Sequence, residues 1–363
     1  MQGSMSHSKR GFTLIELLIA MAVALVVLGA AVGLYTKGME TVNRVTSRAD
    51  MQANVRVGFN ELTRDLYRAG TGIPFGGIPI PSAASGGVNP RFACDALQCY
   101  VPGNNSLTQG TLFAVTPGNN VGPLTTETTD AITLSYIDPT LNWTAYPTTT
   151  ITSTNPITVT MPVGTTPLLN DPAFGLNIGD VLMLSNTNGQ ALGVVTAFSA
   201  AARTITFANG DPLRMNQSAA PAGNIPSIAT AGSNPKTYPP TTISRVVMST
   251  YYLQTVVGAD GLADSRLMRQ IGARTPQPLA EHIQDLKFFY DLWSDQAGAL
   301  TVGSPDCVPN GANPPTPAPG LIRKVSIRIA VRSIRRDKYN VYDSVSYTSS
   351  VGPRNLSFHD RYQ

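Results

Sequence analysis

An apolar stretch near the N-terminus constrains this chain more than any other feature of its sequence. From Phe12 to Tyr35 it carries one charged side chain, that of Glu16, and a short basic leader precedes it. A helix of these 24 residues would be about 36 Å long, which is enough to cross a bilayer. The sequence therefore predicts a transmembrane helix over residues 12–35.

Two ordinary interpretations of this stretch leave part of it unexplained. A secretory signal peptide would have a shorter apolar core with its cleavage site after that core, so the length argues against one. A plain single-pass anchor, with Lys9 and Arg10 held in the cytoplasm, explains the length and the orientation. It does not explain Glu16, because a carboxylate in an apolar medium is costly without a partner.

The leader and the start of the helix read KRGFTLIE over residues 9–16 and resemble the class III signal of type IV pilins and pseudopilins. The resemblance implies a leader over residues 1–11, cleavage by prepilin peptidase between Gly11 and Phe12, and methylation of the new N-terminus at Phe12. The amine at Phe12 would then pair with Glu16 of a neighbouring subunit, which offsets the cost of holding either charge in an apolar medium. Glu16 is therefore expected to act in subunit assembly.

Beyond the apolar stretch, residues 36–70 predict an amphipathic continuation of the same helix. Apolar residues recur mostly every three or four positions, with charged residues between them, which favours a stripe that faces the protein core. Glu40 and Arg44 have the spacing of a stabilising ion pair, and Gly58 could bend the helix. The glycines and proline that follow predict its end. The apolar positions are Val42, Val45, Ala49, Val55, Phe59, Leu62, Leu66 and Ala69.

Residues 71–126 are rich in proline and glycine and predict a loop region with one strand at residues 112–115. Its length fits either a partner-binding excursion or a poorly ordered insert. Within it, Cys94 and Cys99 could form a disulfide bond in an oxidising compartment. Cys307 is the third cysteine, and the sequence does not decide how the three pair.

The rest of the chain predicts antiparallel β-structure. We expect a β module over residues 127–215, with a tight hairpin turn at Asn188-Gly189, and a C-terminal β-rich part over residues 216–363. In the latter, residues 246–256 and 265–271 predict a hairpin, 279–287 a short amphipathic helix, and 322–333 an alternating, half-buried strand. The predicted fold class is α+β: a long N-terminal pilin helix packed on a loop-rich, mainly antiparallel β head.

Few residues suggest catalysis or the binding of a metal, a cofactor or DNA. The chain has three histidines, without metal-ligand spacing, and none of the common catalytic or nucleotide-binding motifs, so we expect no enzyme activity, metal or cofactor. Asp260 and Asp264 lie at a turn where calcium could bind, but turn chemistry explains them better. A net charge of +4, or +2 without the leader, does not by itself indicate DNA binding. The basic stretch could contact DNA or be a solvated strand face; it comprises Arg323, Lys324, Arg328, Arg332, Arg335, Arg336 and Lys338.

Four further segments resemble, in order, the PilW family of type IV minor pilins: residues 62–70, 179–182, 281–288 and 354–356. The resemblance implies a minor pilin that helps to start pilus assembly or lies at the pilus tip, in twitching, adhesion or DNA uptake. It implies as partners prepilin peptidase, other minor and major pilins, the inner-membrane assembly platform and, before assembly, membrane lipid. The protein would be a single-pass inner-membrane protein with its head in the periplasm, and later part of the pilus at the cell surface. Alternatives are a minor pseudopilin of a type II secretion system, a tip adhesin or DNA-binding module, and a simple anchored domain.

Overall fold

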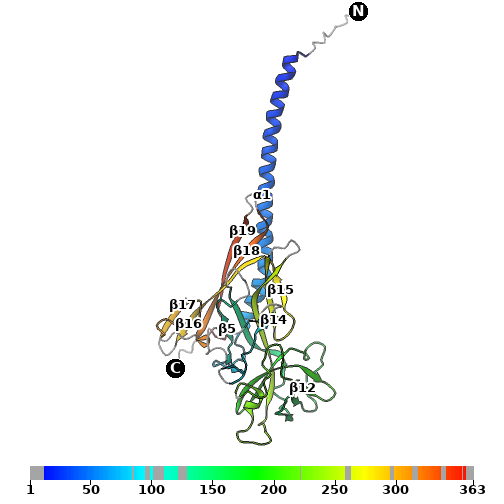
Figure 1. Ribbon diagram of the computed structural model, residues 1–363, viewed down its shortest axis with the longest axis vertical. Coiled ribbons are helices and arrows are strands. Elements are labelled where there is room, and N and C mark those ends of the chain that lie inside the picture. Colours follow the sequence, from blue (N-terminus) through cyan, green and yellow to red (C-terminus); the bar gives the residue numbers. More distant parts are fainter. Residues whose placement is uncertain are drawn as a thin grey trace, which may run out of the picture. The chain divides into compact units, whose positions relative to one another are not determined.

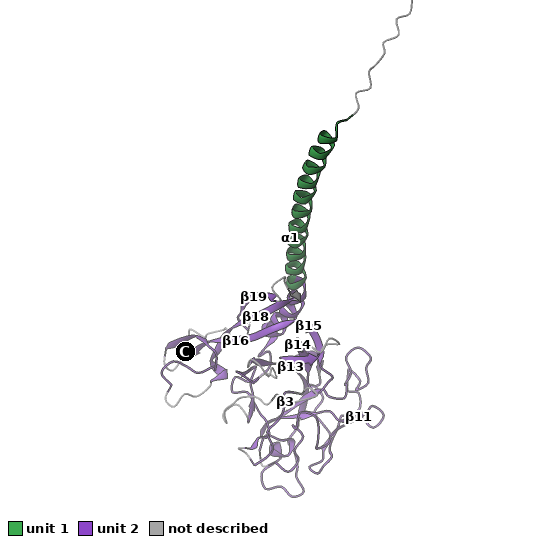
Figure 2. Ribbon diagram, turned by 45° about the horizontal axis from the view of Figure 1, so that its top comes forward, with its two compact units in different colours: residues 1–52 green, residues 53–363 purple. Residues whose placement is uncertain are grey.

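The computed structural model describes residues 12–83, 86–94, 99–100, 110–121, 129–220, 222–257, 263–294, 298–312, 318–336, 341–353 and 355–356. The chain divides into two compact units, residues 1–52 and 53–363 (Figure 2). A long helix crosses the boundary between them, and antiparallel β-sheets follow it in the second unit. The fold class is α+β, as the sequence predicts.

The helix, α1, spans Leu14–Arg68 without interruption. It contains an 18-residue window with a mean hydropathy of 2.8, so it is long and apolar enough to cross a membrane. It ends where glycines follow, because Gly70 and Gly72 have φ values of 85° and 71°, a backbone conformation that side chains with a Cβ disfavour. The two predicted helical segments are therefore one element.

The predicted core-facing stripe is only half correct. Val42 and Val45 are exposed, whereas Val55, Leu62 and Leu66 are buried. The buried positions belong to the part of α1 in the second unit, which packs against the sheet. An apolar spacing shows which face of a helix can be buried, but burial also needs another part of the protein to lie against that face at the same position along the helix.

Asp65 fastens this part of α1 to the sheet. Its side chain is fully buried, and its Oδ2 accepts hydrogen bonds from the Tyr251 hydroxyl at 2.7 Å and from Arg269 Nη2 at 2.7 Å. Tyr251 and Arg269 lie directly opposite each other on neighbouring antiparallel strands. The Tyr136 hydroxyl, from a third strand, donates to Asp65 Oδ1 at 3.4 Å. One carboxylate thus joins the helix to three strands, and the arginine compensates its buried charge.

Gly58 allows α1 to lie close to the sheet. A Cβ at this position would come within 2.7 Å of Leu267 Cδ2, on a side chain that is fully buried. We expected Gly58 to permit a bend, but α1 runs through it unbroken. Its observed role is close packing.

The largest sheet has seven strands and is organised around β13. This 16-residue strand pairs with β9 through Thr242–Val246, with β6 through Ser244–Tyr251 and with β14 through Ser249–Val257. The predicted boundary between residues 215 and 216 therefore falls inside one sheet. The strands are β5 (Val115–Gly118), β6 (Ala131–Asn142), β9 (Val181–Asn186), β10 (Gly189–Val194), β13 (Thr242–Val257), β14 (Ala263–Ile271) and β15 (Gln277–Ala280).

Two four-stranded sheets complete the larger elements of the second unit. Figure 1 shows β18 and β19 near one end of this unit and the sheet that contains β12 near the other. The first sheet has the order β17-β16-β18-β19 and the second β11-β12-β8-β7. Their strands are β7 (Thr150–Ile151), β8 (Ile157–Thr160), β11 (Ala197–Ser199), β12 (Thr204–Phe207), β16 (Ile283–Ser294), β17 (Ala299–Ser304), β18 (Ile322–Arg336) and β19 (Tyr342–Val351).

The region predicted as loop, residues 71–126, contains only short strands among its described residues, yet these parts are packed. Ile78, Ile80 and Phe92 are buried, which argues against a poorly ordered insert there. The single strand expected at residues 112–115 is wrong, because a turn at Phe113 separates two strands: its N–H donates to Thr116 Oγ1. The short elements are β1 (Ile78–Pro79), β2 (Ala93–Cys94), β3 (Cys99–Tyr100) and β4 (Thr111–Leu112), with 3₁₀ turns η2 (Ile225–Ile228) and η3 (Pro319–Leu321) further on.

The helix predicted over residues 279–287 is wrong. These residues form the end of β15 and the start of β16, with a bend at His282, whose φ is 58°. A β-bulge lies between Ile283 and Asp285, so that Ile283 and Leu286, three residues apart, are both buried. A bulged strand thus reproduces the apolar spacing of a short helix.

Both predicted hairpins are present, with one turn displaced. Strands β13 and β14 pair around residues 258–262, which lie outside the described residues. In the other hairpin, Gly189 pairs with Asn186, so the turn is Thr187-Asn188 rather than Asn188-Gly189. The Asn188 N–H donates to Asn186 Oδ1 at 2.9 Å, which stabilises this turn.

Strand β18 alternates as predicted, with Val325, Ile327, Ile329 and Val331 buried.

Candidate functional site

The start of α1 forms a capping box around the residue predicted to act in assembly. Thr13 precedes the first helical residue, and Glu16 is the third residue of the helix. Glu16 Oε2 accepts hydrogen bonds from Thr13 N at 3.0 Å and from Thr13 Oγ1 at 2.9 Å. In return, Glu16 N donates to Thr13 Oγ1 at 3.4 Å. The sequence Thr-x-x-Glu is the usual pattern of this motif.

The capping box gives Glu16 a role within its own chain. The first N–H groups of a helix lack intrahelical partners, and in an apolar medium each unsatisfied group is costly. Glu16 satisfies one of them and places a negative charge at the positive end of the helix dipole. Its carboxylate therefore lies beside residue 12, where a cleaved chain would carry its amine.

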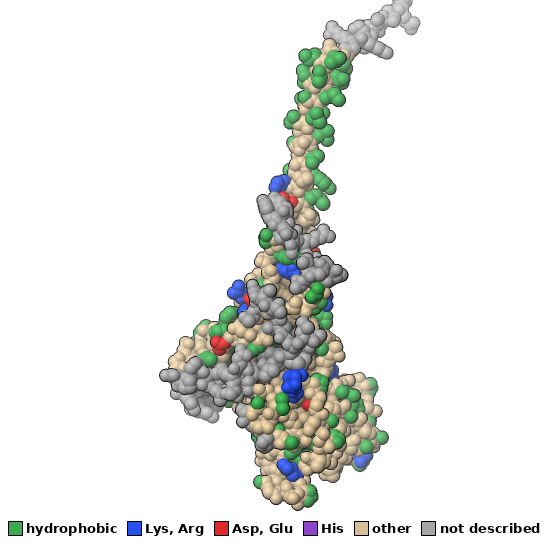
Figure 3. Space-filling model, in the orientation of Figure 1, with side chains coloured by type: hydrophobic (Ala, Val, Ile, Leu, Met, Phe, Trp, Pro, Cys, Tyr) green, Lys and Arg blue, Asp and Glu red, His purple; other side chains and the backbone are tan. Residues whose placement is uncertain are grey.

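Past this cap, α1 presents an apolar surface that the described residues of its unit leave uncovered. Phe12 is 86% exposed, and the large apolar side chains from Leu14 to Tyr35 are all more than half exposed. Figure 3 shows hydrophobic side chains along this part of the helix. Such a surface is stable in lipid or against other helices, but not in water. The Glu40–Arg44 pair is present beyond it, at 3.2 Å.

The other predicted site residues are only partly described. Gly11 lies outside the described residues. Cys94 and Cys99 lie opposite each other in the antiparallel pair β2–β3, a register whose Cα spacing suits a disulfide bond; the bond itself remains a prediction. Cys307 is free and buried, and burial raises the pKa of its thiol, so it is a poor nucleophile.

Asp264 belongs to an ion-pair cluster. Its Oδ1 lies 3.0 Å from Arg332 Nη2, and its Oδ2 lies 2.7 Å from His282 Nδ1. Asp260 lies outside the described residues. Among the residues that are described, no group of three or more potential metal ligands occurs. Asp264 therefore joins β14 to the bend before β16 and to β18, and the calcium alternative receives no support from it.

Most described side chains of the basic stretch have partners. Lys324 lies 3.3 Å from Asp291, and Arg332 pairs with Asp264. Arg323 donates to the Gly320 carbonyl and lies over the ring of Phe75. The side chains of Arg335, Arg336 and Lys338 are outside the described residues. Because partnered cations attract phosphates weakly, the described part of this strand gives little reason to expect DNA binding.

Sequence reasoning missed two features of these sites. The capping box was readable as Thr13-x-x-Glu16, the standard signature of a helix start. Asp65 is one of the charged residues between the apolar positions of residues 36–70, and its burial was not predicted. An acidic residue between Leu62 and Leu66 could have been recognised as lying on the buried face, because positions three and four apart share that face.

The match to a known sequence motif concerns the N-terminal part of the chain. Residues 6–32 match the prokaryotic N-terminal methylation motif. The chain is also 32% identical over 99 residues to the pilin-like protein PilA3 of Thermus thermophilus, a match that covers 25% of this chain and 41% of that relative. No solved structure matches. The chain thus carries a prokaryotic N-terminal methylation motif at the head of a membrane-length helix, and these matches support a type IV pilin or pseudopilin.

Proposed function

We propose that the protein is a minor pilin of the PilW kind, assembled into a type IV pilus through α1. Prepilin peptidase removes residues 1–11, the amine of Phe12 is methylated, and that amine pairs with Glu16 of a neighbouring subunit. The observation that carries the proposal is the capping box, because it holds the carboxylate of Glu16 at the end of an exposed apolar helix, next to the residue that cleavage would make N-terminal.

The size of the second unit supports a minor rather than a major subunit. It extends over residues 53–363 and contains three sheets of four or more strands. A subunit repeated throughout a closely packed fibre has little room for so large a head, whereas one placed at the start or tip of the fibre is not limited in this way. The proposal therefore assigns a structural role, in starting assembly or forming the tip, and no catalytic one.

The proposed location follows from α1. Before assembly the apolar part of the helix lies in the inner membrane, with the second unit in the periplasm, and contacts lipid and the assembly platform. On assembly, other pilins replace the lipid around the exposed apolar side chains, and the protein becomes part of the pilus at the cell surface. Both environments keep these side chains out of water.

Mass spectrometry of the mature N-terminus tests this proposal. We expect the chain to begin at N-methylated Phe12 in cells with prepilin peptidase and to keep residues 1–11 in cells without it. An intact leader in both strains would reduce the protein to an anchored domain. Counting the copies of this protein per copy of the major pilin in sheared pili tests the minor role, and equal numbers would contradict it.

A pseudopilin of a type II secretion system remains the alternative, because the methylation motif and the apolar helix suit both assemblies. Deleting the gene separates the two. Loss of surface pili with normal secretion supports the pilus, whereas loss of secretion with normal pili supports the secretion system.

A further inference from the structure

A cavity of about 570 Å³ lies in the second unit, beside the central strand β13. Its walls come from β6, β13 and β14, from the segment 170–177 and from the end of α1. The volume is within the usual range for small-molecule sites. Unlike most such sites, it is lined mainly by polar and charged side chains.

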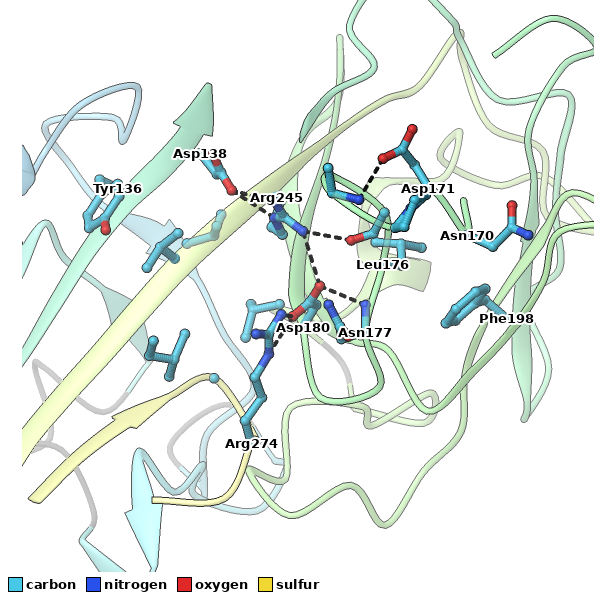
Figure 4. A pocket seen from close by; sticks show the side chains of 18 of the residues that line it. Tyr136, Asp138, Asn170, Asp171, Leu176, Asn177, Asp180, Phe198, Arg245 and Arg274 are labelled. Atoms are coloured by element: carbon cyan, nitrogen blue, oxygen red, sulfur yellow. Dashed lines mark hydrogen bonds and ion pairs between the residues drawn. The ribbon is translucent and has the colours of Figure 1, made fainter. Parts of the chain in front are cut away.

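The four arginines that line the cavity each have a carboxylate partner. Arg245 Nη2 lies 2.6 Å from Asp138, Arg269 Nη2 lies 2.7 Å from Asp65, and Arg274 pairs with Asp180. Arg64 Nη2 lies 2.7 Å from Glu61. Figure 4 shows the chain formed by Asp138, Arg245, Asp180 and Arg274 across the site. These pairs leave the guanidinium groups little net charge with which to attract an anion.

One lining carboxylate is left over. Among the described residues Asp171 has no ion pair, and its Oδ1 accepts hydrogen bonds from the N–H groups of Ala173 and Phe174, both at 2.9 Å. Two of the arginine partners, Glu61 and Asp65, do not line the cavity, and with them the charges around the site are close to balanced. A phosphate or carboxylate ligand would meet no arginine without a carboxylate partner, whereas an uncharged polar ligand needs none.

The segment beside the cavity is held in place before any ligand arrives. Arg245 Nη1 donates to the Gly175 carbonyl at 3.0 Å, and Asp180 Oδ2 accepts from Asn177 N at 3.0 Å. Gly175 is packed so closely that a Cβ would lie 2.4 Å from the Asp171 carbonyl oxygen. A site fixed in this way loses little conformational entropy on binding.

The remaining groups that line the cavity include both polar and aromatic side chains. Asn170 and Asn177 are exposed residues whose amides can both donate and accept, and the free side of Asp171 can accept. Phe198 adds an aromatic surface, and Figure 4 places it with Asn170 and Asp171 on one side of the ion-pair chain. A ligand that suits this lining has several hydroxyl groups, which donate and accept, and an apolar face for the ring.

We propose that this cavity binds an uncharged saccharide. The hydroxyl groups would bond to Asn170, Asn177 and Asp171, while a C–H face of the sugar ring would lie against Phe198. The inference concerns the second unit alone and does not depend on how α1 assembles.

Saturation-transfer NMR on the full chain in detergent micelles tests the inference. The probes are methyl glycosides of glucose, galactose, mannose and N-acetylglucosamine, with glucuronic acid as the charged counterpart of glucose. We expect transfer to at least one neutral glycoside, and affinity at least about tenfold lower in a variant with Asn170→Ala and Asn177→Ala, because two ligand hydrogen bonds are lost. Both positions are exposed, so the variant should unfold at the wild-type temperature.

Asn310→Ala is the matched control, because Asn310 is also an exposed asparagine but does not line the cavity. It should bind as the wild type does. The inference is overturned if no neutral glycoside binds, if the double variant binds as tightly as wild type, or if glucuronic acid binds more tightly than the neutral sugars.

Discussion

Glu16 caps the helix in its own chain, and the proposed function gives it a second role, as a charge for a neighbour. Substitutions can separate these two roles. Gln can replace Glu in a capping box, so Glu16→Gln keeps the cap and removes the charge, while Glu16→Ala removes both. We expect both variants to be processed and inserted normally. In sheared pili both should be reduced about tenfold or more, because the neighbour's amine is left buried without a partner.

Thr13→Ala is the control for the charge, since it removes the capping hydroxyl but leaves Glu16 in place. It should cost about 0.5–2 kcal/mol of helix stability. The amount of this variant in pili should stay close to that of the wild type. Immunoblots of sheared pili measure the amount of protein incorporated, and immunoblots of membranes measure the amount inserted. Normal incorporation of Glu16→Gln would show that capping suffices and would refute the charge pairing.

Tyr251 offers a residue-scale test of how α1 is fastened. Burial, and then the nearby Asp65 carboxylate, raise the pKa of Tyr251, so its hydroxyl stays protonated and donates to Asp65. Tyr251→Phe should lower the free energy of unfolding by about 1–3 kcal/mol, because a buried carboxylate loses a partner. Tyr67→Phe on the exposed side of α1 should change it by less than about 0.5 kcal/mol. Denaturant unfolding of the full chain compares the two variants. Equal losses of unfolding free energy would contradict the role of Tyr251 in fastening α1.

At the scale of elements, Gly58→Leu tests the close packing of α1 on β14. The new side chain would meet Leu267 and should destabilise the second unit by about 1–3 kcal/mol, despite the better helix propensity of leucine. Gly38→Leu is the matched control, because nothing lies within 4 Å of a Cβ there. Thermal unfolding in detergent measures both. A Gly58 variant as stable as its control would show that the helix does not pack as described.

The elements show what the sequence could and could not reveal. The apolar run of α1 and the alternation of β18 depend on neighbours along the chain, and both were predicted correctly. The helix expected at residues 279–287 failed because a bulge beside His282 produces the same local spacing. The capping box was available from Thr13 and Glu16 alone, whereas the charge balance of the cavity was not. Arg245 and Asp138 are 107 residues apart, and no local pattern pairs them.

The same limit applies to the whole molecule. The parts expected over residues 127–215 and 216–363 share one sheet, because β13 pairs with both β6 and β9, which precede it by many residues. The strands of both parts were recognisable as β-structure. Their partners were not, because antiparallel pairing depends on long-range contacts that alternation does not specify.

Acid should weaken the second unit partly through the Asp138–Arg245 pair, which joins β6 to β13. Burial raises the pKa of Asp138, but hydrogen bonds from Thr140 and Arg245 outweigh it and hold the pKa below its ordinary value of 3.8. A carboxylate with a lowered pKa stabilises the folded state above its unfolded pKa and loses this effect as the pH falls through the folded pKa. Asp138→Asn should therefore be less stable than wild type at pH 7, with the gap narrowing below pH 3.8. A difference in the free energy of unfolding between the two proteins that stays constant from pH 7 to acid would contradict this.

The attachment of α1 through Asp65 has a mechanical consequence. In the proposed fibre, tension would pull on this subunit through its helix and would pass into the sheet where helix and sheet are joined. Tyr251 and Arg269 lie opposite each other on β13 and β14, so the force would enter both strands of this hairpin at one point. Asp65 is therefore the residue through which this load would pass from the helix to the hairpin.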